Sequence, residues 1–466
     1  MGLEIDLTYG VIGQKGGGPG KNVSATGTAA GALATHGGTT ADSGLNTDVT
    51  GVIEMKWMYT EFDLTGKDSL LPFIPVETRG RAGLQSFGDL TDKTKVAYAT
   101  GDFPGFSATT TFAPNLKTKL AYVVVESEVG GGNRGAGGTK GSRGHDFAVI
   151  VSPEYTVYKG LDIKPIYSFF RAEGATDGAA RRDAADPHLA GGTTNAAATF
   201  GTWYVGGDPT LKENRHTIGF DASWRLGPWG FDPTLLYQWG TRDQRAVTNT
   251  SAGASLVTEA KKSAFYFDAI GSFQLGPLLV EARGAYTTGN KARDNLGKRI
   301  SYYEPLDTDT GYYSSWGAII GLSDQDYGTG CAVMAQACSF VGYDRYGRAQ
   351  LGLRGTYALT PAFSVFLTIN PTWTAEKVDI DTGVNASGSR TVIDSQSFAK
   401  GDSSYIGTET NIGFGWKFAP NVGFDVIGAY LASGKALNTA EIVNGVHTIR
   451  EAKDAYAVSS RIRFGF

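Results

Sequence analysis

Two segments carry charged residues at alternating positions. "VETRGRAGLQS" contains Glu77, Arg79 and Arg81, and "LLVEARGAYTTG" contains Glu281 and Arg283. Successive side chains of a β-strand point to opposite faces, so the charges of each segment would lie on one face of a strand. Carboxylate and guanidinium groups arranged in this way can attract ions and orient polar solutes. The chemistry that they indicate is electrostatic, and it requires strands with one face in water.

The same alternation occurs in further segments. "HTIGFDASWRLGP" places Ile218 and Trp224 on one face and Asp221 and Arg225 on the other. These alternating segments are longer than the strands of a soluble β-sandwich usually are, about 5–6 residues. We expect the following charged residues on polar strand faces of this kind: Glu77, Arg79, Arg81, Asp221, Arg225, Glu281, Arg283, Arg348 and Arg354.

The composition favours strands over helices. Glycine, tyrosine and phenylalanine supply 65, 22 and 24 of the 466 residues, which is typical of strands and turns. A net charge of -4 offers no basic surface for nucleic acid. No apolar run approaches the roughly 18 residues of a transmembrane helix, but a spanning strand needs only about 9–11 residues. Because "MGLEIDLTYG" begins directly with an alternating pattern, we expect mature numbering with an export leader removed.

Links of two lengths connect the alternating segments. Short links built from Pro, Gly and Asn, such as "YKGLD" (158–162) and "FAPNV" (418–422), alternate with long polar links. Tight turns at one end and large loops at the other are typical of transmembrane β-barrels. The predicted strands are 2–10, 51–64, 76–87, 95–113, 117–129, 146–158, 162–172, 215–227, 230–243, 260–275, 278–290, 347–360, 362–376, 405–418, 421–433 and 455–466.

The predicted fold class is therefore all-β, a single transmembrane antiparallel β-barrel of about 16 strands. Eighteen strands are possible if 65–113 holds an extra hairpin. We expect one domain, 1–466, with large external loops near 11–48, 173–214, 291–346 and 378–404. Lipid cannot satisfy an open strand edge, so the last strand should close on the first.

The chain ends in "DAYAVSSRIRFGF", an alternating strand that finishes on Phe466. Together with the even strand number and the alternating link lengths, this ending resembles bacterial outer-membrane porins. The resemblance implies that Phe466 is the assembly signal. It also implies a homotrimer in the bacterial cell outer membrane, among its lipids and lipopolysaccharide. The alginate-export type of barrel, usually of eighteen strands, is the second resemblance.

General porins place an arginine cluster opposite an acidic inserted loop, which gives a transverse field across the constriction. The resemblance implies such a cluster here, whereas pairing of the same arginines with neighbouring carboxylates is the alternative. Loop 129–145 is basic where the porin pattern is acidic, so 291–346 is the better candidate for the constricting loop. Its aromatic residues, Tyr302, Tyr303 and Trp316 among them, would either stack on sugar rings or pack the loop on itself. The arginines of the implied cluster are Arg79, Arg81, Arg283 and Arg354.

Two motifs in the long loops have other chemistry. Cys331 and Cys338, in "GCAVMAQACS", are spaced to form a disulfide, as expected of an exported protein. The segments "DTDTG" and "DIDTG" space their carboxylates as calcium loops do, but both lack the bidentate glutamate of an EF-hand. A solvated turn is the alternative reading. The possible calcium ligands are Asp307, Asp309, Asp379 and Asp381.

The five histidines are scattered and have no nucleophile motif beside them, which argues against an enzyme. The sequence predicts a channel, a porin, for passive diffusion of ions and small hydrophilic solutes, with no cofactor and no nucleic-acid partner. A substrate-selective or polysaccharide channel of the alginate type, for export or uptake, is one alternative. A plugged structural barrel is the other.

Overall fold

The computed structural model of the chain describes most of the strands and parts of the links between them. The residues described are 2–7, 53–85, 87, 98–99, 103–127, 145–172, 203–204, 210–247, 255–291, 294, 298–306, 316–320, 346–378, 380, 382–384, 390–392, 401–443 and 446–464.

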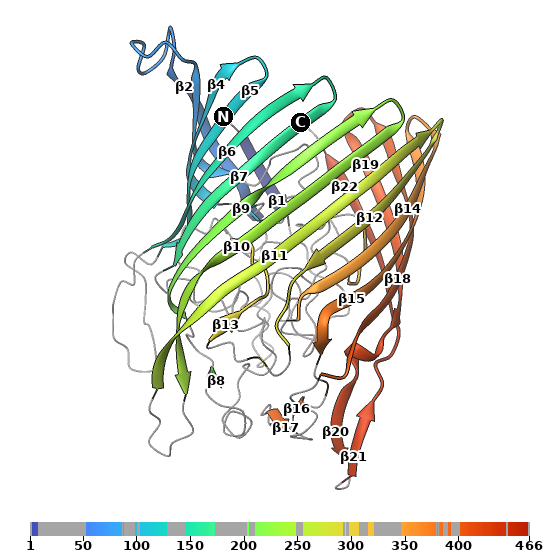
Figure 1. Cartoon of the computed structure of the whole chain (residues 1–466). Coiled ribbons are helices and arrows are strands. Elements are labelled where there is room, and N and C mark those ends of the chain that lie inside the picture. Colours follow the sequence, from blue (N-terminus) through green and yellow to red (C-terminus); the bar gives the residue numbers. More distant parts are fainter. Residues whose placement is uncertain are drawn as a thin grey trace.

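Sixteen long strands form one antiparallel sheet that curves into a barrel (Figure 1). Two strands of two residues each, β8 (Trp203–Tyr204) and β13 (Arg299–Ile300), complete the sheet. The long strands are β1 (Gly2–Leu7), β2 (Ile53–Thr65), β3 (Thr78–Gln85), β4 (Phe103–Ala113), β5 (Leu116–Ser127), β6 (His145–Tyr158), β7 (Leu161–Ala172), β9 (Thr210–Leu226), β10 (Trp229–Val247), β11 (Ser255–Leu275), β12 (Leu278–Thr287), β14 (Arg348–Thr360), β15 (Phe363–Val378), β18 (Ser403–Ala419), β19 (Val422–Ser433) and β22 (Ala455–Phe464).

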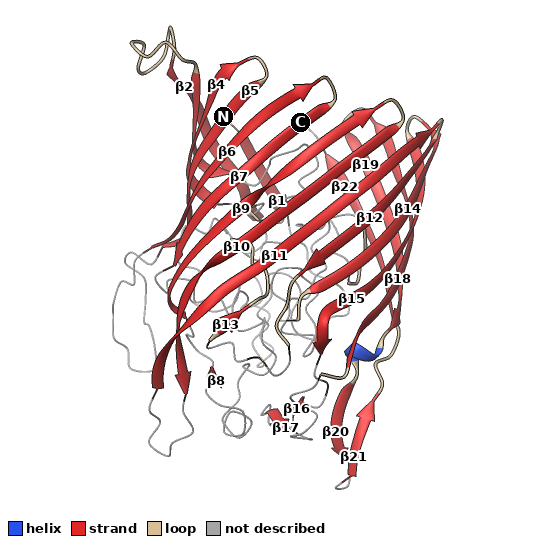
Figure 2. Ribbon diagram, viewed as in Figure 1, coloured by secondary structure: helices blue, strands red, loops and turns tan. Residues whose placement is uncertain are grey.

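Three smaller elements lie among the long links. They are the hairpin β16 (Thr382–Val384) with β17 (Arg390–Val392), the hairpin β20 (Thr439–Val443) with β21 (Val446–Arg450), and the 3₁₀ turn η3 (Lys435–Leu437). The 3₁₀ turn is the blue segment of Figure 2. No helix among the described residues is long and apolar enough to cross a membrane.

The structure confirms all sixteen predicted strands in their predicted order. The fourth is shorter than expected, because Tyr98 and Ala99 form a turn and β4 begins only at Phe103. The extra hairpin considered for 65–113 is absent from its described part, where Thr65 and Leu71 form only an isolated bridge. Each long strand pairs with its neighbours in sequence, which is the up-and-down order expected of a barrel.

Two-residue turns join six strand pairs at one end of the barrel, and the longer links lie mostly at the other (Figure 1). Gly160, Gly227 and Gly276 stand in these turns with φ of 99°, 56° and 55°. Glycine adopts such angles without strain, which explains why the short links are glycine-rich. The pairing of β22 with β1 that would close the barrel is not among the described strand pairs. The closure therefore stays a prediction.

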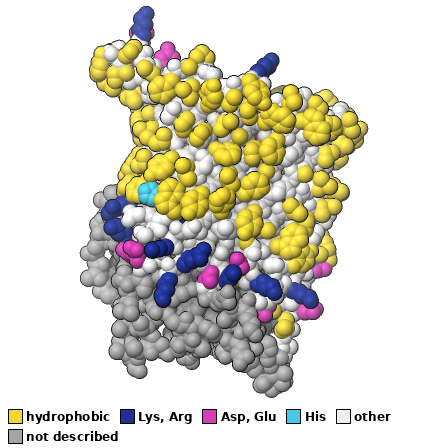
Figure 3. Space-filling model, in the orientation of Figure 1, with side chains coloured by type: hydrophobic (Ala, Val, Ile, Leu, Met, Phe, Trp, Pro, Cys, Tyr) yellow, Lys and Arg dark blue, Asp and Glu magenta, His cyan; other side chains and the backbone are white. Residues whose placement is uncertain are grey.

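The outward face of the wall is apolar. On β9, Ile218 is 48% exposed, whereas its neighbour Thr217 is fully buried. The same contrast recurs from strand to strand, and the outward side chains form the broad apolar surface of Figure 3. A soluble monomer rarely exposes a contiguous apolar patch larger than a few hundred Å². This surface therefore requires an apolar surrounding.

Aromatic side chains mark both edges of the apolar surface. Trp229 packs on Phe273 near the two-residue turns, with ring centroids 4.4 Å apart. Trp239 stacks on His216 nearer the long links, at 5.2 Å. Ten residues of β10 separate the two tryptophans, about 33 Å of strand, or about 25 Å across the barrel wall at the usual strand tilt. That height matches the apolar band of an outer-membrane barrel, about 25 Å between aromatic girdles.

Two clusters of buried apolar residues lie inside the barrel. The first joins inward residues of β4–β7 and β10–β12 to residues of two links, Phe87 and Tyr98 of one and Tyr303 and Leu306 of the other. The second joins β15, β18 and β19 to Ile320 and Tyr346. Because both clusters include link residues, parts of the links pack inside the wall rather than projecting away from it.

Candidate functional site

The link between β12 and β14 lies inside the barrel in both of its longer described parts. We call residues 298–306 the inner strap and residues 316–320 the second inner segment. The inner strap contacts β9, β10 and β11, and the second inner segment contacts β15 and β18. These two groups of strands are separated by β12 and β14 in the sheet. One link therefore lines two stretches of the inner wall and narrows the space between them.

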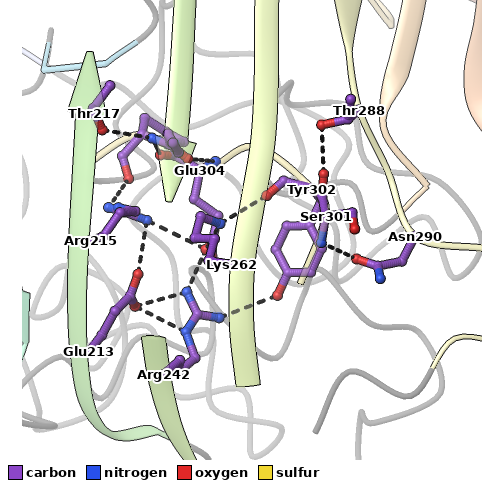
Figure 4. A network of polar contacts seen from close by, with 12 residues as sticks. Glu213, Arg215, Thr217, Arg242, Lys262, Thr288, Asn290, Ser301, Tyr302 and Glu304 are labelled. Atoms are coloured by element: carbon purple, nitrogen blue, oxygen red, sulfur yellow. Dashed lines mark hydrogen bonds and ion pairs between the residues drawn. The ribbon is translucent and has the colours of Figure 1, made fainter. Parts of the chain in front are cut away.

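Glu304 of the inner strap stands at the centre of a buried charge network (Figure 4). Its Oε2 accepts hydrogen bonds from Arg242 and from Lys262 Nζ, the latter at 2.6 Å, and lies 3.4 Å from Arg215 Nη1. Glu213 completes the network with an ion pair to Arg242 at 2.8 Å. None of the five side chains is more than 3% exposed.

The wall also holds the backbone of the inner strap. Gln238 donates to the Glu304 carbonyl at 2.7 Å and accepts from its N–H at 3.1 Å. Arg215 donates to the Pro305 carbonyl at 2.9 Å, and Lys262 donates to the Tyr302 carbonyl at 2.8 Å. Polar groups buried without partners are costly, so these contacts make the wall and the strap mutually dependent.

The network contains three cations and two carboxylates, so it depends on Glu304 for charge balance. Burial alone would raise the pKa of the Glu304 carboxyl. Arg242, Lys262 and Arg215, together with the hydrogen bond from Lys262, outweigh burial and hold that pKa well below its usual range. Glu304 is therefore ionised at neutral pH. Removing one member of a buried ion pair typically costs about 3–5 kcal/mol.

Hydrogen bonds from backbone N–H groups to a carboxylate hold the second inner segment. The Glu409 carboxylate accepts from the N–H groups of Ala318, Ile319 and Ile320, the last two at 3.0 and 2.8 Å. Asn370 donates to the Trp316 carbonyl. Residues 316–320 form bends rather than a helical turn.

The loop aromatics pack within the protein where they are described. Tyr302, Tyr303 and Trp316 are each less than 5% exposed. Tyr303 lies against Tyr266 with ring centroids 4.9 Å apart, and the Lys262 ammonium lies 5.1 Å from the centre of the Tyr302 ring. Of the two alternatives, packing of the loop is confirmed for these three residues, and none of them offers an open face to a sugar.

The predicted arginines do not form one cluster. Arg79 and Arg81 lie on β3, Arg283 on β12 and Arg354 on β14. Seven long strands stand between β3 and β12, so the two groups lie on opposite sides of the barrel. The transverse field implied by the porin resemblance would need one arginine wall, which this placement does not provide.

Several of these arginines instead pair with a carboxylate on the neighbouring strand. Arg283 donates twice to Asp268, at 3.0 and 2.7 Å, and Arg81 donates to Glu61 at 2.7 Å. Arg79 lies 3.8 Å from Asp63, and both side chains are about two-thirds exposed.

The remaining predicted residues are placed as follows. Arg225 makes a bidentate pair with Asp232 at 2.6 and 2.9 Å, close to a short turn. Asp221 is buried and accepts from Thr234 at 2.8 Å. Glu77 is exposed and precedes the first residue of β3. In the sheet Glu281 lies opposite Arg354, and Arg348 is buried at the start of β14.

Several predictions fall on residues that the structure does not describe. These are the disulfide of Cys331 with Cys338, the four carboxylates Asp307, Asp309, Asp379 and Asp381, and the assembly role of Phe466. Among the residues that are described, no group of three or more His, Cys, Asp or Glu could hold a metal ion.

Sequence reasoning missed the charge network of the inner strap. A signal for its wall residues was present, because the two-residue turn at 227–228 fixes the register of β9 against β10. That register places Arg242 directly opposite Glu213. The position of Glu304 had no comparable signal, because no periodicity determines where a residue of a long link will dock.

Comparisons with known proteins give distant matches. No family model and no curated protein matches the chain. Three solved structures from Pseudomonas aeruginosa are similar in outline. OccK8 (OprE) is 13% identical, with a TM-score of 0.38, over 83% of this chain and 76% of that chain. OccK10 (OpdN) is 11% identical, with 0.38, over 84% and 81%. The outer membrane protein OprD is 10% identical, with 0.37, over 83% and 75%.

Proposed function

We propose that this chain is a non-enzymatic channel of the bacterial outer membrane, through which ions and small hydrophilic solutes diffuse passively. The observation that carries the proposal is the inverted distribution of side chains across the wall. Large apolar residues face outward at 37% exposure or more, while charged residues such as Arg215, Asp221 and Arg283 lie on the inward face. Lipid accounts for the first face, and a water-filled interior accounts for the second.

The orientation in the membrane follows from the links. In outer-membrane barrels, short turns face the periplasm and long loops face the outside. The end with the two-residue turns is therefore periplasmic, and the link that holds the inner strap enters the barrel from outside.

The inner strap favours a narrow channel over a wide one. Its Glu304 is fully buried against cations from three strands, each of which is 0–3% exposed. Moving the strap out of the interior would therefore be costly. This arrangement supports a substrate-selective channel as the refined form of the proposal. The pore-lining residues proposed are Glu77, Arg79, Arg81, Asp221, Arg225, Glu281, Arg283, Arg348 and Arg354.

Three further properties belong to the same proposal. They are a single domain over 1–466, contact of the apolar surface with lipids and lipopolysaccharide, and assembly as a homotrimer. Cross-linking in native membranes tests the last, since a trimer yields a ladder that stops at three chains.

The experiment that tests the function is single-channel recording in a planar bilayer, with a salt gradient for ion selectivity. Discrete ohmic steps are expected, small for a barrel of sixteen strands because the inner strap occupies part of the interior. A membrane that stays silent with inserted, folded protein would contradict the channel and leave the plugged structural barrel. Current that a polyanionic sugar blocks would favour the polysaccharide channel.

A further inference from the structure

The barrel wall is lower at β12 and β14 than on either side. β12 ends at Thr287 and β14 begins at Arg348, whereas β11 starts at Ser255 and β15 extends to Val378. The β11–β12 pairing accordingly begins only at Tyr266, which lies opposite Thr287. The wall thus has a notch toward the long-link end, between two taller hairpins.

Link segments fill the notch only in part. Thr288 donates its N–H to the Phe265 carbonyl at 3.0 Å, and β13 pairs in parallel with Lys261 and Lys262 of β11. On the far side, the Glu376 N–H donates to the Tyr346 carbonyl at 2.9 Å. A pocket of about 470 Å³ remains between these segments. Its volume falls within the range of small-molecule sites, about 300–1,000 Å³.

The pocket combines aromatic faces with charged groups. Tyr237, Phe265 and Tyr286 line one part, and each is about two-fifths exposed on the outward face. Charged residues line the other part, two cations and two carboxylates, which balance in charge: Lys291, Arg299, Asp294 and Glu376.

This lining matches the chemistry of a sugar. The C–H faces of a sugar ring pack on aromatic rings, and its hydroxyl groups hydrogen-bond to carboxylates and cations together. An acyl chain would place hydrocarbon against four charged side chains and exclude water from them, which is costly.

The height of the pocket identifies the source of the sugar. Tyr237 and Phe265 lie opposite each other beside Trp239, near the edge of the apolar surface that faces the long links. Charged residues follow immediately beyond that edge (Figure 3). In an outer membrane, this is the level of lipid head groups on the external side. We propose that the notch pocket binds a saccharide head group of an outer-leaflet glycolipid. The proposal rests on the membrane orientation given under the proposed function.

Tyr286→Ser is the test variant, since the side chain lines the pocket and makes no contact with the inner strap described above. Tyr122→Ser is its matched control. Tyr122 is an outward tyrosine of equal exposure, 42% against 43%, and lies outside the pocket. Thr288 and Ser301 are unsuitable, because Thr288 donates to the Ser301 carbonyl at the base of the strap. Glu376→Gln is a second variant that changes the polar side of the pocket.

Binding of rough-type lipopolysaccharide to the detergent-purified full chain is measured by native mass spectrometry. We expect Tyr286→Ser and Glu376→Gln each to weaken binding about tenfold, and Tyr122→Ser to change it less than about twofold. Core oligosaccharide without lipid should bind more weakly but with the same dependence on Tyr286, which shows that the sugar occupies the pocket. Unchanged affinity in both variants would overturn the proposal, as would equal competition by a phospholipid that has no sugar.

Loss of an oligomer in Tyr286→Ser, with lipopolysaccharide binding intact, would also overturn the proposal and assign the pocket to a second copy of the chain. Recording conductance from the same preparations separates this proposal from the channel. A conducting Tyr286→Ser protein that has lost lipopolysaccharide supports both proposals. A silent wild-type protein that binds lipopolysaccharide through Tyr286 removes the channel alone.

Discussion

The wall at β9–β11 and the wall at β2–β3 carry the same kinds of charged residues in opposite surroundings. Arg242 and Glu304 are buried, with 3% and 0% of their side chains exposed, and three strands and a link converge on them. Arg79 and Asp63 are 66% and 67% exposed and lie 3.8 Å apart. Exposed pairs contribute about 0–1 kcal/mol, whereas breaking a buried pair costs about 3–5 kcal/mol. Burial, rather than charge type, decides which pairs shape the channel.

The largest effect is expected from Glu304→Ala. The change leaves three buried cations with Glu213 as their remaining carboxylate in the network, and it destabilises the docked strap by about 3–5 kcal/mol. Single-channel conductance should rise, and larger sugars should enter in a liposome-swelling assay. Glu61→Ala is the matched control, since Glu61 also accepts from an arginine but is about one-third exposed. Equal conductance of Glu304→Ala and wild type would show that the strap does not narrow the channel.

Glu409→Ala should have an intermediate effect. It removes the acceptor of three backbone N–H groups, and an unsatisfied buried donor costs about 1–3 kcal/mol. Limited proteolysis of the intact barrel should then cut near 316–320 faster than in wild type. Exposed Glu259→Ala serves as the control. If the two variants are cut at the same rate, the second inner segment is held by its apolar contacts instead.

The effect of pH on the docking of the inner strap should be small, and it tests the same contrast between buried and exposed charges. A carboxyl whose pKa is lowered on folding contributes stability that is present above its ordinary pKa, 4.5 for Glu304, and is lost as the pH falls through the folded value. Conductance should therefore be constant from about pH 5 to pH 7, with release of the strap only below about pH 4. A transition near neutral pH would mean that another group controls the strap.

The smallest effect is expected from Arg79→Ala. Because the pair with Asp63 is exposed and screened by salt, the free energy of unfolding should change by less than about 1 kcal/mol. This free energy is measured by urea unfolding, with the folded fraction determined from the gel mobility of the folded barrel. A change as large as that of Glu304→Ala would contradict the role given to burial.

The strands of the barrel wall could be predicted from the sequence, whereas the docking of a link inside the barrel could not. Alternation and turn residues fix strands such as β9 and β10, because a shift of one residue would turn Ile218 and Trp224 from lipid into the interior. The same alternation places Arg283 of β12 and Asp268 of β11 on the inward face, where they pair. Pairing of arginines with neighbouring carboxylates could therefore also be predicted from the sequence. Glu304 and Glu409 act through a link folded back on the wall, and such long-range docking leaves no periodic trace.

The low wall at β12 and β14 has a consequence for the order of assembly. Glu304 meets partners 42 to 89 residues earlier in the chain, on three strands whose register must already be set. Contacts of such long range form late, because they require ordered neighbours before they return any stabilisation. The strap therefore passes over the notch into a wall that is already built.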